Sequence, residues 1–429
     1  MTAKESRDGF LWMRCFFIDS IGYFSFALKN YVTTLYVTTL LHTFMLQLIT
    51  MEVRPFNFGT LADEEYFCNR TAEQQKLVSN FLMGINTLLI SARRWGKSSL
   101  VEMTAKRIMR KEKNIRFCYI DLFNTRSERE FYELMAQQII KATATKTEER
   151  TQAVKKFFRS LLPSIGISPD QKQEFTLSFS INELKRNPDE VLDLAENIAK
   201  AKKIKIVVCI DEFQNISYYE NALAFQKKLR SHWQKHKQAS YCLYGSKKHM
   251  LMDIFGSVKM PFYRFGNFMF LEKIETKHWV PYIVQRFEKT GKRISPHLAS
   301  QISTLMENHP YHVQQYAQEV WDVCTKSTKP TDLEIALDQL LRQMTILYQR
   351  EVDLLSNMQV NFLKAICSGV EKFSSLEVLR DFNLGSSGNI KRAKEALVEK
   401  EVIDIDNNKP SFSDPLFRIW FWRIYMQRS

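Results

Sequence analysis

The sequence has no paired or clustered cysteines of the kind that hold a metal. Its seven cysteines are scattered along 429 residues, with no C-x-x-C pair and no cysteine–histidine cluster. This pattern argues against a zinc site and a disulfide framework, and it favours a reducing, cytoplasmic compartment. Cys118 and Cys209 fall inside predicted buried strands, where a thiol packs as a small hydrophobic group.

Low-complexity tracts are absent as well, and the composition is that of a folded protein. Hydrophobic residues make up 45% of the chain and charged residues 25%, which is ordinary for a globular protein of two or three domains. The formal net charge of +14 is strongly basic. Such a charge favours a polyanionic partner, chiefly nucleic acid or an anionic membrane surface, and a merely cationic soluble protein is the alternative.

The first fifty residues differ from the rest. Residues 31–50 contain no charged residue, and their length would suit a membrane span. However, six threonines, a histidine and a glutamine weaken that interpretation, and the small-residue cleavage site of a secretory signal is missing. Three interpretations stay open: a start site assigned upstream of the true one at Met51, a membrane anchor, or a packed N-terminal helix. We favour the first, and we expect no membrane partner.

A phosphate-binding loop is predicted after residue 87. The apolar run TLLIS at 87–91 has the character of a buried parallel strand, and a helical pattern begins at about residue 98. The loop between them ends in G-K-S, as the P-loop motif G-x-x-x-x-G-K-[ST] requires. The residues expected to contact a nucleotide are Ser91, Ala92, Arg93, Arg94, Trp95, Gly96, Lys97, Ser98 and Ser99.

Three residues of this loop have distinct expected roles. Gly96 lets the backbone wrap closely around phosphate oxygens at the start of a helix. Lys97 would reach the β- and γ-phosphates, and the Ser98 hydroxyl would bind Mg²⁺. Ser91 stands where the motif has its first glycine, so the loop carries a Cβ there and is less free.

A second apolar run, IKIVVCI at 204–210, ends in Asp211 and Glu212. Parallel strands present the residues at their carboxyl ends to a ligand, so these acids should lie beside the phosphates. Asp211 is the expected Mg²⁺ partner, and Glu212 is the expected general base for the attacking water. A solvated turn that carries two acids is the alternative. Because no N/T-K-x-D element for guanine is present, the predicted nucleotide is ATP.

Together these motifs resemble the STAND-type P-loop ATPases of the AAA-related lineage, in particular the archaeal and bacterial group with a C-terminal winged helix. The resemblance covers the chain from about Pro55 onwards. It rests on A-R-R-W-G-K-S, on I-D-E-F-Q and on F-C-N-R-T-A-E at 67–73. The last of these is similar to an element that packs near adenine, with Asn69 in place of its glycine and Arg70 as its arginine.

Three more residues acquire roles from this resemblance. Ser246, after the run YCLYG, would face the γ-phosphate as a sensor residue. Arg264, in P-F-Y-R, would stabilise γ-phosphate charge as an arginine finger or sensor, and a plain surface arginine is the alternative. Pro310, in N-H-P-Y, would lie against the base, and a simple helix start with proline at N1 is the alternative.

The predicted fold is α/β: a P-loop NTPase with a parallel sheet flanked by helices, followed by a helical lid and a winged helix-turn-helix. Expected domains are 51–275, 276–350 and 351–429, with a hairpin insertion at EFTLSFSI (174–181) and the wing at 407–422. The third helix of the last domain would begin at Ser386–Lys394, and docking onto the ATPase is the alternative to DNA contact. Its candidate DNA-contacting residues are Asn389, Lys391, Arg392 and Lys394.

We expect the protein to be a nucleotide-driven switch that acts on a protein client or on DNA. The alternative is a DNA-binding regulator that responds to nucleotide but hydrolyses little of it. An oligomer is compatible with both interpretations.

Overall fold

The structure is a computed structural model that describes residues 54–62, 64–144, 166–169, 175–178, 188–406 and 408–428. The predictions made for residues 1–50 therefore lie outside the described residues. Residues Pro55–Ser429 form one compact unit, and the description below concerns that unit. Within the described part, every helix is too short or too polar to cross a membrane.

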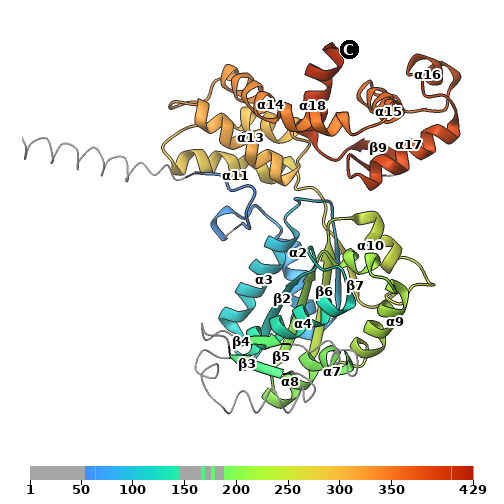
Figure 1. Cartoon of the computed structure of the whole chain (residues 1–429). Helices are drawn as coiled ribbons and strands as arrows, with labels where there is room; N and C mark the ends of the chain where they lie inside the picture. The colour runs from blue at the N-terminus through green and yellow to red at the C-terminus, as the bar shows by residue number, and fades with distance from the viewer. Residues whose placement is uncertain are drawn as a thin grey trace, which may run out of the picture. The chain divides into compact units, whose positions relative to one another are not determined.

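A five-stranded parallel sheet forms the centre of the first half of this unit (Figure 1). Its strand order is β2-β5-β6-β1-β7. The strands are β1 (Thr87–Ile90), β2 (Ile115–Asp121), β5 (Lys205–Asp211), β6 (Ala239–Gly245) and β7 (Asn267–Phe270). The predicted runs at 87–91 and 204–210 match β1 and β5 within one residue, and Cys118 lies in β2, as expected of a buried strand. Strand β7, on the edge, was not predicted, because only one of its four residues is fully buried.

Helices cover both faces of the sheet, which explains why its strands are mostly apolar rather than alternating between apolar and polar residues. Helices α2 (Thr71–Met83) and α3 (Lys97–Lys111) pack on one face, against residues such as Leu89, Val207 and Cys209. The residues that alternate with these along the strands, such as Leu88 and Val208, point to the other face and join a larger hydrophobic cluster there. That side carries α4 (Glu128–Thr143), α7 (Pro188–Leu192), α8 (Leu194–Lys202), α9 (Ala222–Trp233) and α10 (Lys248–Phe255).

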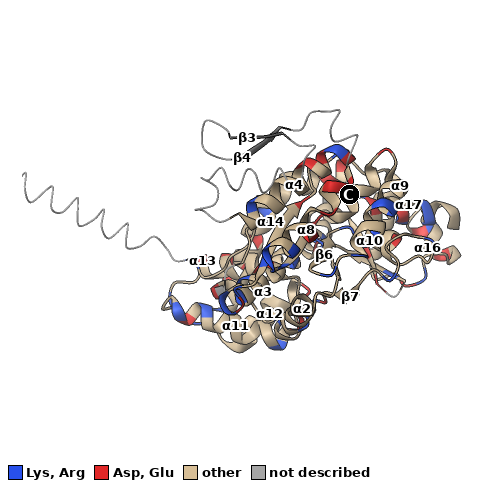
Figure 2. Cartoon of the chain, turned by 90° about the horizontal axis from the view of Figure 1, so that it is seen from below, with Lys and Arg blue, Asp and Glu red and all other residues tan. Residues whose placement is uncertain are grey.

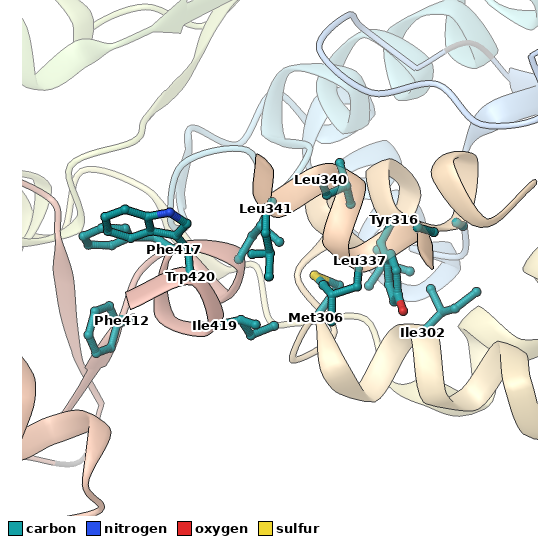
Figure 3. Close-up of a cluster of buried hydrophobic side chains, with 14 of the residues drawn as sticks. Ile302, Met306, Tyr316, Leu337, Leu340, Leu341, Phe412, Phe417, Ile419 and Trp420 are labelled. Atoms are coloured by element: carbon teal, nitrogen blue, oxygen red, sulfur yellow. The ribbon is translucent and has the colours of Figure 1, made fainter. Parts of the chain in front are cut away.

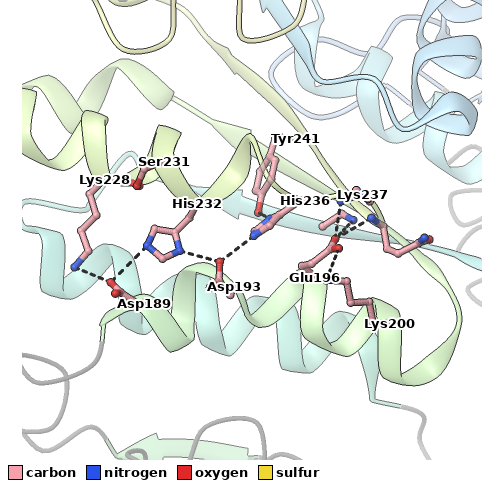
Figure 4. A network of polar contacts seen from close by, with 12 residues as sticks. Asp189, Asp193, Glu196, Lys200, Lys228, Ser231, His232, His236, Lys237 and Tyr241 are labelled. Atoms are coloured by element: carbon pink, nitrogen blue, oxygen red, sulfur yellow. Dashed lines mark hydrogen bonds and ion pairs between the residues drawn. The ribbon is translucent and has the colours of Figure 1, made fainter.

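A buried polar network fixes the turn that leads into β6 (Figure 4). The Glu196 carboxylate accepts hydrogen bonds from the backbone N–H groups of Lys237, Gln238 and Ala239 at 2.8–3.1 Å. Next to it, Asp193 accepts from His232 and His236 at 2.8 and 3.0 Å. Because three main-chain donors share one carboxylate, the start of the central strand is held in a single position.

The predicted hairpin insertion is present, with one strand in a different place. Strands β3 (Gly166–Pro169) and β4 (Phe175–Ser178) pair antiparallel. The run EFTLSFSI therefore supplies only β4, and its partner strand comes from the residues before it.

Helices make up most of the remainder of the chain. Two 3₁₀ turns, η1 (Glu64–Tyr66) and η3 (Phe213–Tyr218), belong to the first half of the unit, and the helices of the second half begin at residue 276. They are α11 (Thr276–Lys289), α12 (Pro296–Leu305), α13 (Pro310–Val323), α14 (Pro330–Asp353), α15 (Asn357–Cys367), α16 (Leu376–Asp381) and α17 (Ser387–Glu399). The chain ends in β8 (Ile403–Asp406), β9 (Lys409–Phe412), α18 (Pro415–Trp420), the π-helical turn η4 (Phe421–Tyr425) and α19 (Met426–Arg428).

The wing was predicted too far along the chain. The hairpin is β8–β9, at 403–412, and residues from Pro415 are helical. Asp414 caps this helix by accepting hydrogen bonds from the N–H groups of Leu416 and Phe417 at 2.8 and 2.9 Å. The aspartate–proline pair is a helix-start signal, and it explains why a strand cannot continue past residue 413.

The helices of the predicted lid and the winged helix share one hydrophobic cluster (Figure 3). Phe417 and Trp420 of α18 pack on Tyr348 of α14, with ring centroids 5.1 and 5.7 Å apart. Helix α14 runs through residue 350 to Asp353, so we place the boundary between these two domains at its end.

Candidate functional site

The predicted phosphate loop lies at the carboxyl end of β1. Two of its residues have positive φ, Arg94 at 62° and Gly96 at 87°. Only glycine adopts this conformation without strain, so Gly96 lets the chain turn directly into α3, which begins at Lys97. The first N–H groups of that helix therefore face the loop, as an anion site requires.

Lys97 is buried, with only 6% of its surface exposed. Its Nζ donates to the carbonyl oxygen of Ala92 at 3.1 Å, so the ammonium group lies inside the loop. Burial lowers the pKa of Lys97, and the charges of Asp211 and Glu212 oppose that shift. A buried ammonium group of this kind is stabilised by an anion placed beside it.

The two predicted metal ligands lie in contact. Ser98 Oγ donates to Asp211 Oδ2 at 2.6 Å, although the two residues are 113 positions apart in the sequence. Asp211 ends β5, and β6 lies between that strand and β1. Burial raises the pKa of Asp211 to about 6, against the hydrogen bond from Ser98, which lowers it. Lys97, Ser98 and Asp211 thus share one edge of the sheet.

Glu212 and Ser246 also come together at this edge. Glu212 has a φ of 50°, a left-handed conformation that turns the chain sharply after β5. Its Oε2 accepts a hydrogen bond from Ser246 Oγ at 3.0 Å. A second donor to the same oxygen is the side-chain amide of Gln214, a residue without a predicted role.

A cavity of about 380 Å³ connects these residues to the start of the helical region. Its lining includes seven residues of the predicted phosphate loop: Arg93, Arg94, Trp95, Gly96, Lys97, Ser98 and Ser99. Asp211, Glu212, Ser246, Arg70 and Pro310 line it too. Among the other lining residues are the aromatic residues Phe58, Tyr66, Trp279 and Tyr311, which were not predicted. Only their three-dimensional placement identifies them, because aromatic residues occur throughout this sequence.

Of the three residues predicted near the adenine base, Arg70 and Pro310 line the cavity and Asn69 does not. Asn69 and Arg70 both have positive φ, 54° and 72°, as expected for a position that replaces glycine. Arg70 is buried and pairs with Glu73 at 2.9 Å, whereas the Asn69 side chain is exposed and is not part of the cavity wall. Pro310 is the first residue of α13 and also lines the cavity. A helix start at this proline is therefore compatible with a contact between the proline and the base.

The remaining loop residues shape the site without all facing the cavity. Ser91 is buried, and its hydroxyl donates to the Ala92 carbonyl at 3.0 Å. Ser99 Oγ accepts from the backbone N–H of Ala62 at 3.0 Å, which ties the segment before α2 to the loop helix. Arg94 lies over the ring of Tyr311, 4.6 Å from its centroid.

Arg264, predicted as an arginine finger or sensor, does not line this cavity, and its position agrees with the alternative of a surface arginine. It precedes β7, whose first residue Asn267 pairs in parallel register with Thr87, the first residue of β1. Arg264 is therefore at the amino edge of the sheet, whereas the phosphate loop follows the carboxyl edge. The four-residue strand alone separates the two edges by about 13 Å. The side chain is exposed and lies over the ring of Tyr263.

The residues present fit a nucleotide and a divalent cation. A hydroxyl and a carboxylate in contact are oxygen donors of the type that Mg²⁺ prefers. The left-handed turn at Gly96 leaves nothing within 4 Å of the place where a Cβ would stand, so the loop has open space on that side. Lys97 would face phosphate oxygens, while Ser98 and Asp211 would hold the cation.

Comparison with known proteins agrees with this geometry. The profile of the KAP family P-loop domain matches residues 94–226, and that of a probable winged helix domain matches residues 346–423. No curated protein is significantly similar in sequence.

Solved structures are similar in fold. A Walker-type ATPase of Pyrococcus abyssi is 19% identical, with a TM-score of 0.58 over 86% of this chain and 99% of that chain. The ORC2 protein of Aeropyrum pernix, in ADPNP–ADP complexes, is 15% identical, with a TM-score of 0.52 over 85% of this chain and 97% of that chain. The α/β prediction with a C-terminal winged helix is confirmed. The chain has the fold of a P-loop NTPase followed by a winged helix domain.

Proposed function

We propose that this protein is a Mg²⁺-dependent ATPase that works as a molecular switch. The observation that carries the proposal is the contact of Ser98 with Asp211 at 2.6 Å, next to the buried ammonium group of Lys97. A hydroxyl, a carboxylate and a cation at one sheet edge are the parts that phosphoryl transfer needs. An adenine nucleotide is also the ligand named for the A. pernix structure.

The chain's own residues would act mainly by position and charge. Lys97 and the first N–H groups of α3 would bind the β- and γ-phosphates and stabilise the charge that develops on them. Glu212 would accept a proton from the water that attacks the γ-phosphorus, and Ser246 lies beside it. Mg²⁺, held by Ser98 and Asp211, would supply further neutralisation of phosphate charge.

Metal removal tests this proposal directly. We expect the purified full-length chain to release phosphate from ATP in the presence of Mg²⁺. With EDTA in excess the rate should fall by about tenfold or more, because the phosphate charge then lacks its counter-ion. The measurement is steady-state phosphate release, with GTP as the comparison nucleotide. Equal rates with and without EDTA would remove Mg²⁺ from the proposal.

The winged helix is the part that would sense the nucleotide state. Arg93 of the phosphate loop lies 3.7 Å from Glu401, and Lys248 of α10 lies 3.9 Å from Asp404 of β8. A cavity of about 800 Å³ separates the same surfaces and is lined by Arg94, Glu351 and other charged residues. Because Arg93 also lines the nucleotide cavity, phosphate and Glu401 would compete for it.

A charge exchange tests this docking. Lys248→Asp and Asp404→Lys should each loosen the winged helix, because each places like charges opposite one another. Both side chains are more than a third exposed, so the expected effect is small, about two- to fivefold in the opening equilibrium. The measurement is hydrogen exchange of the backbone at residues 246–249.

The double variant should restore the slow exchange. Lys409→Glu, which reverses an exposed pair inside the winged helix, is the matched control and should leave exchange at 246–249 unchanged. If the double variant exchanges as fast as the single ones, the Lys248–Asp404 pair does not hold the two surfaces together.

A nucleotide-responsive DNA-binding regulator is the second candidate. Of the predicted contact residues, Lys391 and Lys394 line a cavity of about 640 Å³ together with Lys247 and His249 of the ATPase part. The third helix α17 therefore faces the ATPase part in this conformation, which favours docking over DNA contact. Acidic and basic residues are also interspersed along the helices (Figure 2). DNA binding would then require the winged helix to move away.

A further inference from the structure

Gln214 lies immediately behind the proposed general base. It follows Asp211 and Glu212 on the first turn of η3, and only 1% of its surface is exposed. Its Nε2 donates to Glu212 Oε2. Because an ionised carboxylate can only accept, the amide nitrogen and not the amide oxygen must face it.

Gly245, the last residue of β6, makes room for this amide. A Cβ at position 245 would overlap the Gln214 side-chain amide, with Cδ at 3.0 Å, and would stand 3.4 Å from Glu212 Cα. The absence of a side chain at residue 245 therefore leaves the space that the Gln214 amide occupies. Any larger residue would move Gln214 away from Glu212.

The two donors to Glu212 approach the same oxygen. Ser246 Oγ donates to Oε2 at 3.0 Å, and Gln214 Nε2 donates to Oε2 as well. Among the described residues, no hydrogen bond to Oε1 is found. The carboxylate is thus fixed through one oxygen, and the other is left to accept a proton.

We propose that Gln214 is a positioning residue for ATP hydrolysis. Together with Ser246 it holds Glu212 Oε2 in place, so that Oε1 faces the attacking water. The inference rests on the proposed ATPase function and adds to it a residue that acts through Glu212. Gln214 is not part of the wall of the nucleotide cavity; it lines an adjoining cavity together with Glu212 and Ser246. Its effect should therefore fall on turnover and not on binding.

Gln214→Met is the test, because methionine keeps the length and the packing but has no N–H donor. In the full-length chain we expect kcat to fall about 10- to 100-fold, as for a misplaced catalytic group. The Kd for ATP, measured by nucleotide titration, should stay within about twofold. Gln226→Met removes another buried glutamine amide, on α9, and should leave kcat unchanged.

A double-mutant cycle separates positioning from general packing. If Gln214 acts through Glu212, adding Gln214→Met to Glu212→Gln should not lower the residual single-turnover rate further. A further loss equal to that of the single variant would overturn the inference. So would a Gln214→Met protein with wild-type kcat while Glu212→Gln remains inactive, and in that case the ATPase function itself would stand.

Gly245→Ala provides a second route if Gln214→Met does not fold. The added methyl group should displace the Gln214 amide and lower kcat to a similar extent without a change in Kd. A folded Gly245→Ala protein with unchanged kcat would contradict the proposal. If the wild-type chain does not hydrolyse ATP at all, both the proposed function and this inference fail together.

Discussion

Lys97→Ala should weaken nucleotide binding strongly and leave the fold intact. The expected loss of affinity for ATP is on the order of 100-fold, or about 2.7 kcal/mol, because the side chain supplies the cation inside the phosphate loop. The ammonium group is buried, and burial lowers its pKa, so the charged form is not stabilised by the fold itself. The thermal unfolding temperature of the nucleotide-free protein should therefore not fall, and ATP should no longer raise it.

Lys106→Ala is the matched control for this experiment. Lys106 lies on the same helix, and its side chain is 50% exposed and paired with Glu102 at 3.8 Å. Its removal should change neither affinity nor unfolding temperature. If Lys97→Ala bound ATP as tightly as the wild type, the cavity described above would not be the phosphate site.

Glu212→Gln should have the opposite signature, with binding retained and turnover lost. The substitution keeps the size of the side chain and its ability to accept from Ser246, but it removes the charge that accepts a proton from water. General-base catalysis typically contributes a factor of about 10²–10⁴, so kcat should fall at least 100-fold. Single-turnover hydrolysis and nucleotide titration measure the two quantities separately.

Glu102→Gln, at a half-buried position of α3 where the side chain pairs with Lys106, is the control and should retain full turnover. Equal turnover in wild type and Glu212→Gln would remove Glu212 from its assigned role. The nearby Asp211 would not be a simple substitute, because its Oδ2 already accepts from Ser98 and its Oδ1 accepts from the N–H of Glu212 at 2.8 Å.

The sheet and the phosphate side of the site could be predicted because local signals encode them. An apolar run that ends in a glycine-rich or acidic turn indicates a buried parallel strand and its carboxyl end. The placement of Ser98 against Asp211 follows once two such strands share a sheet. The winged helix was predictable in the same way, because serine residues at helix starts and short helical patterns can be recognised from neighbouring residues alone.

The predictions were weakest where the fold depends on distant contacts. Arg264 was assigned a role from a short motif, but the register of β7 against β1 decides which edge of the sheet it occupies. The wing was placed too late because Asp414 and Pro415 were read as part of the hairpin and not as a helix start. Gln214 was overlooked because its importance depends on Gly245, 31 positions away, and no local pattern reveals that pair.

The polar contacts of Asp414 connect three helices of the C-terminal half: α13, α14 and α18. His312 Nε2 of α13 lies 3.1 Å from Asp414 Oδ1, and the Tyr348 hydroxyl of α14 donates to Asp414 Oδ2 at 3.0 Å. Burial raises the pKa of Asp414, but the hydrogen bond and charge of His312 outweigh it and hold the pKa at about 2.

The start of α13 touches the phosphate loop directly, where Trp95 meets His309 edge to face with ring centroids 6.3 Å apart. A shift of the loop would therefore be transmitted through α13 and Asp414 to α18. The hairpin β8–β9, which directly precedes α18 in the sequence, would move with it.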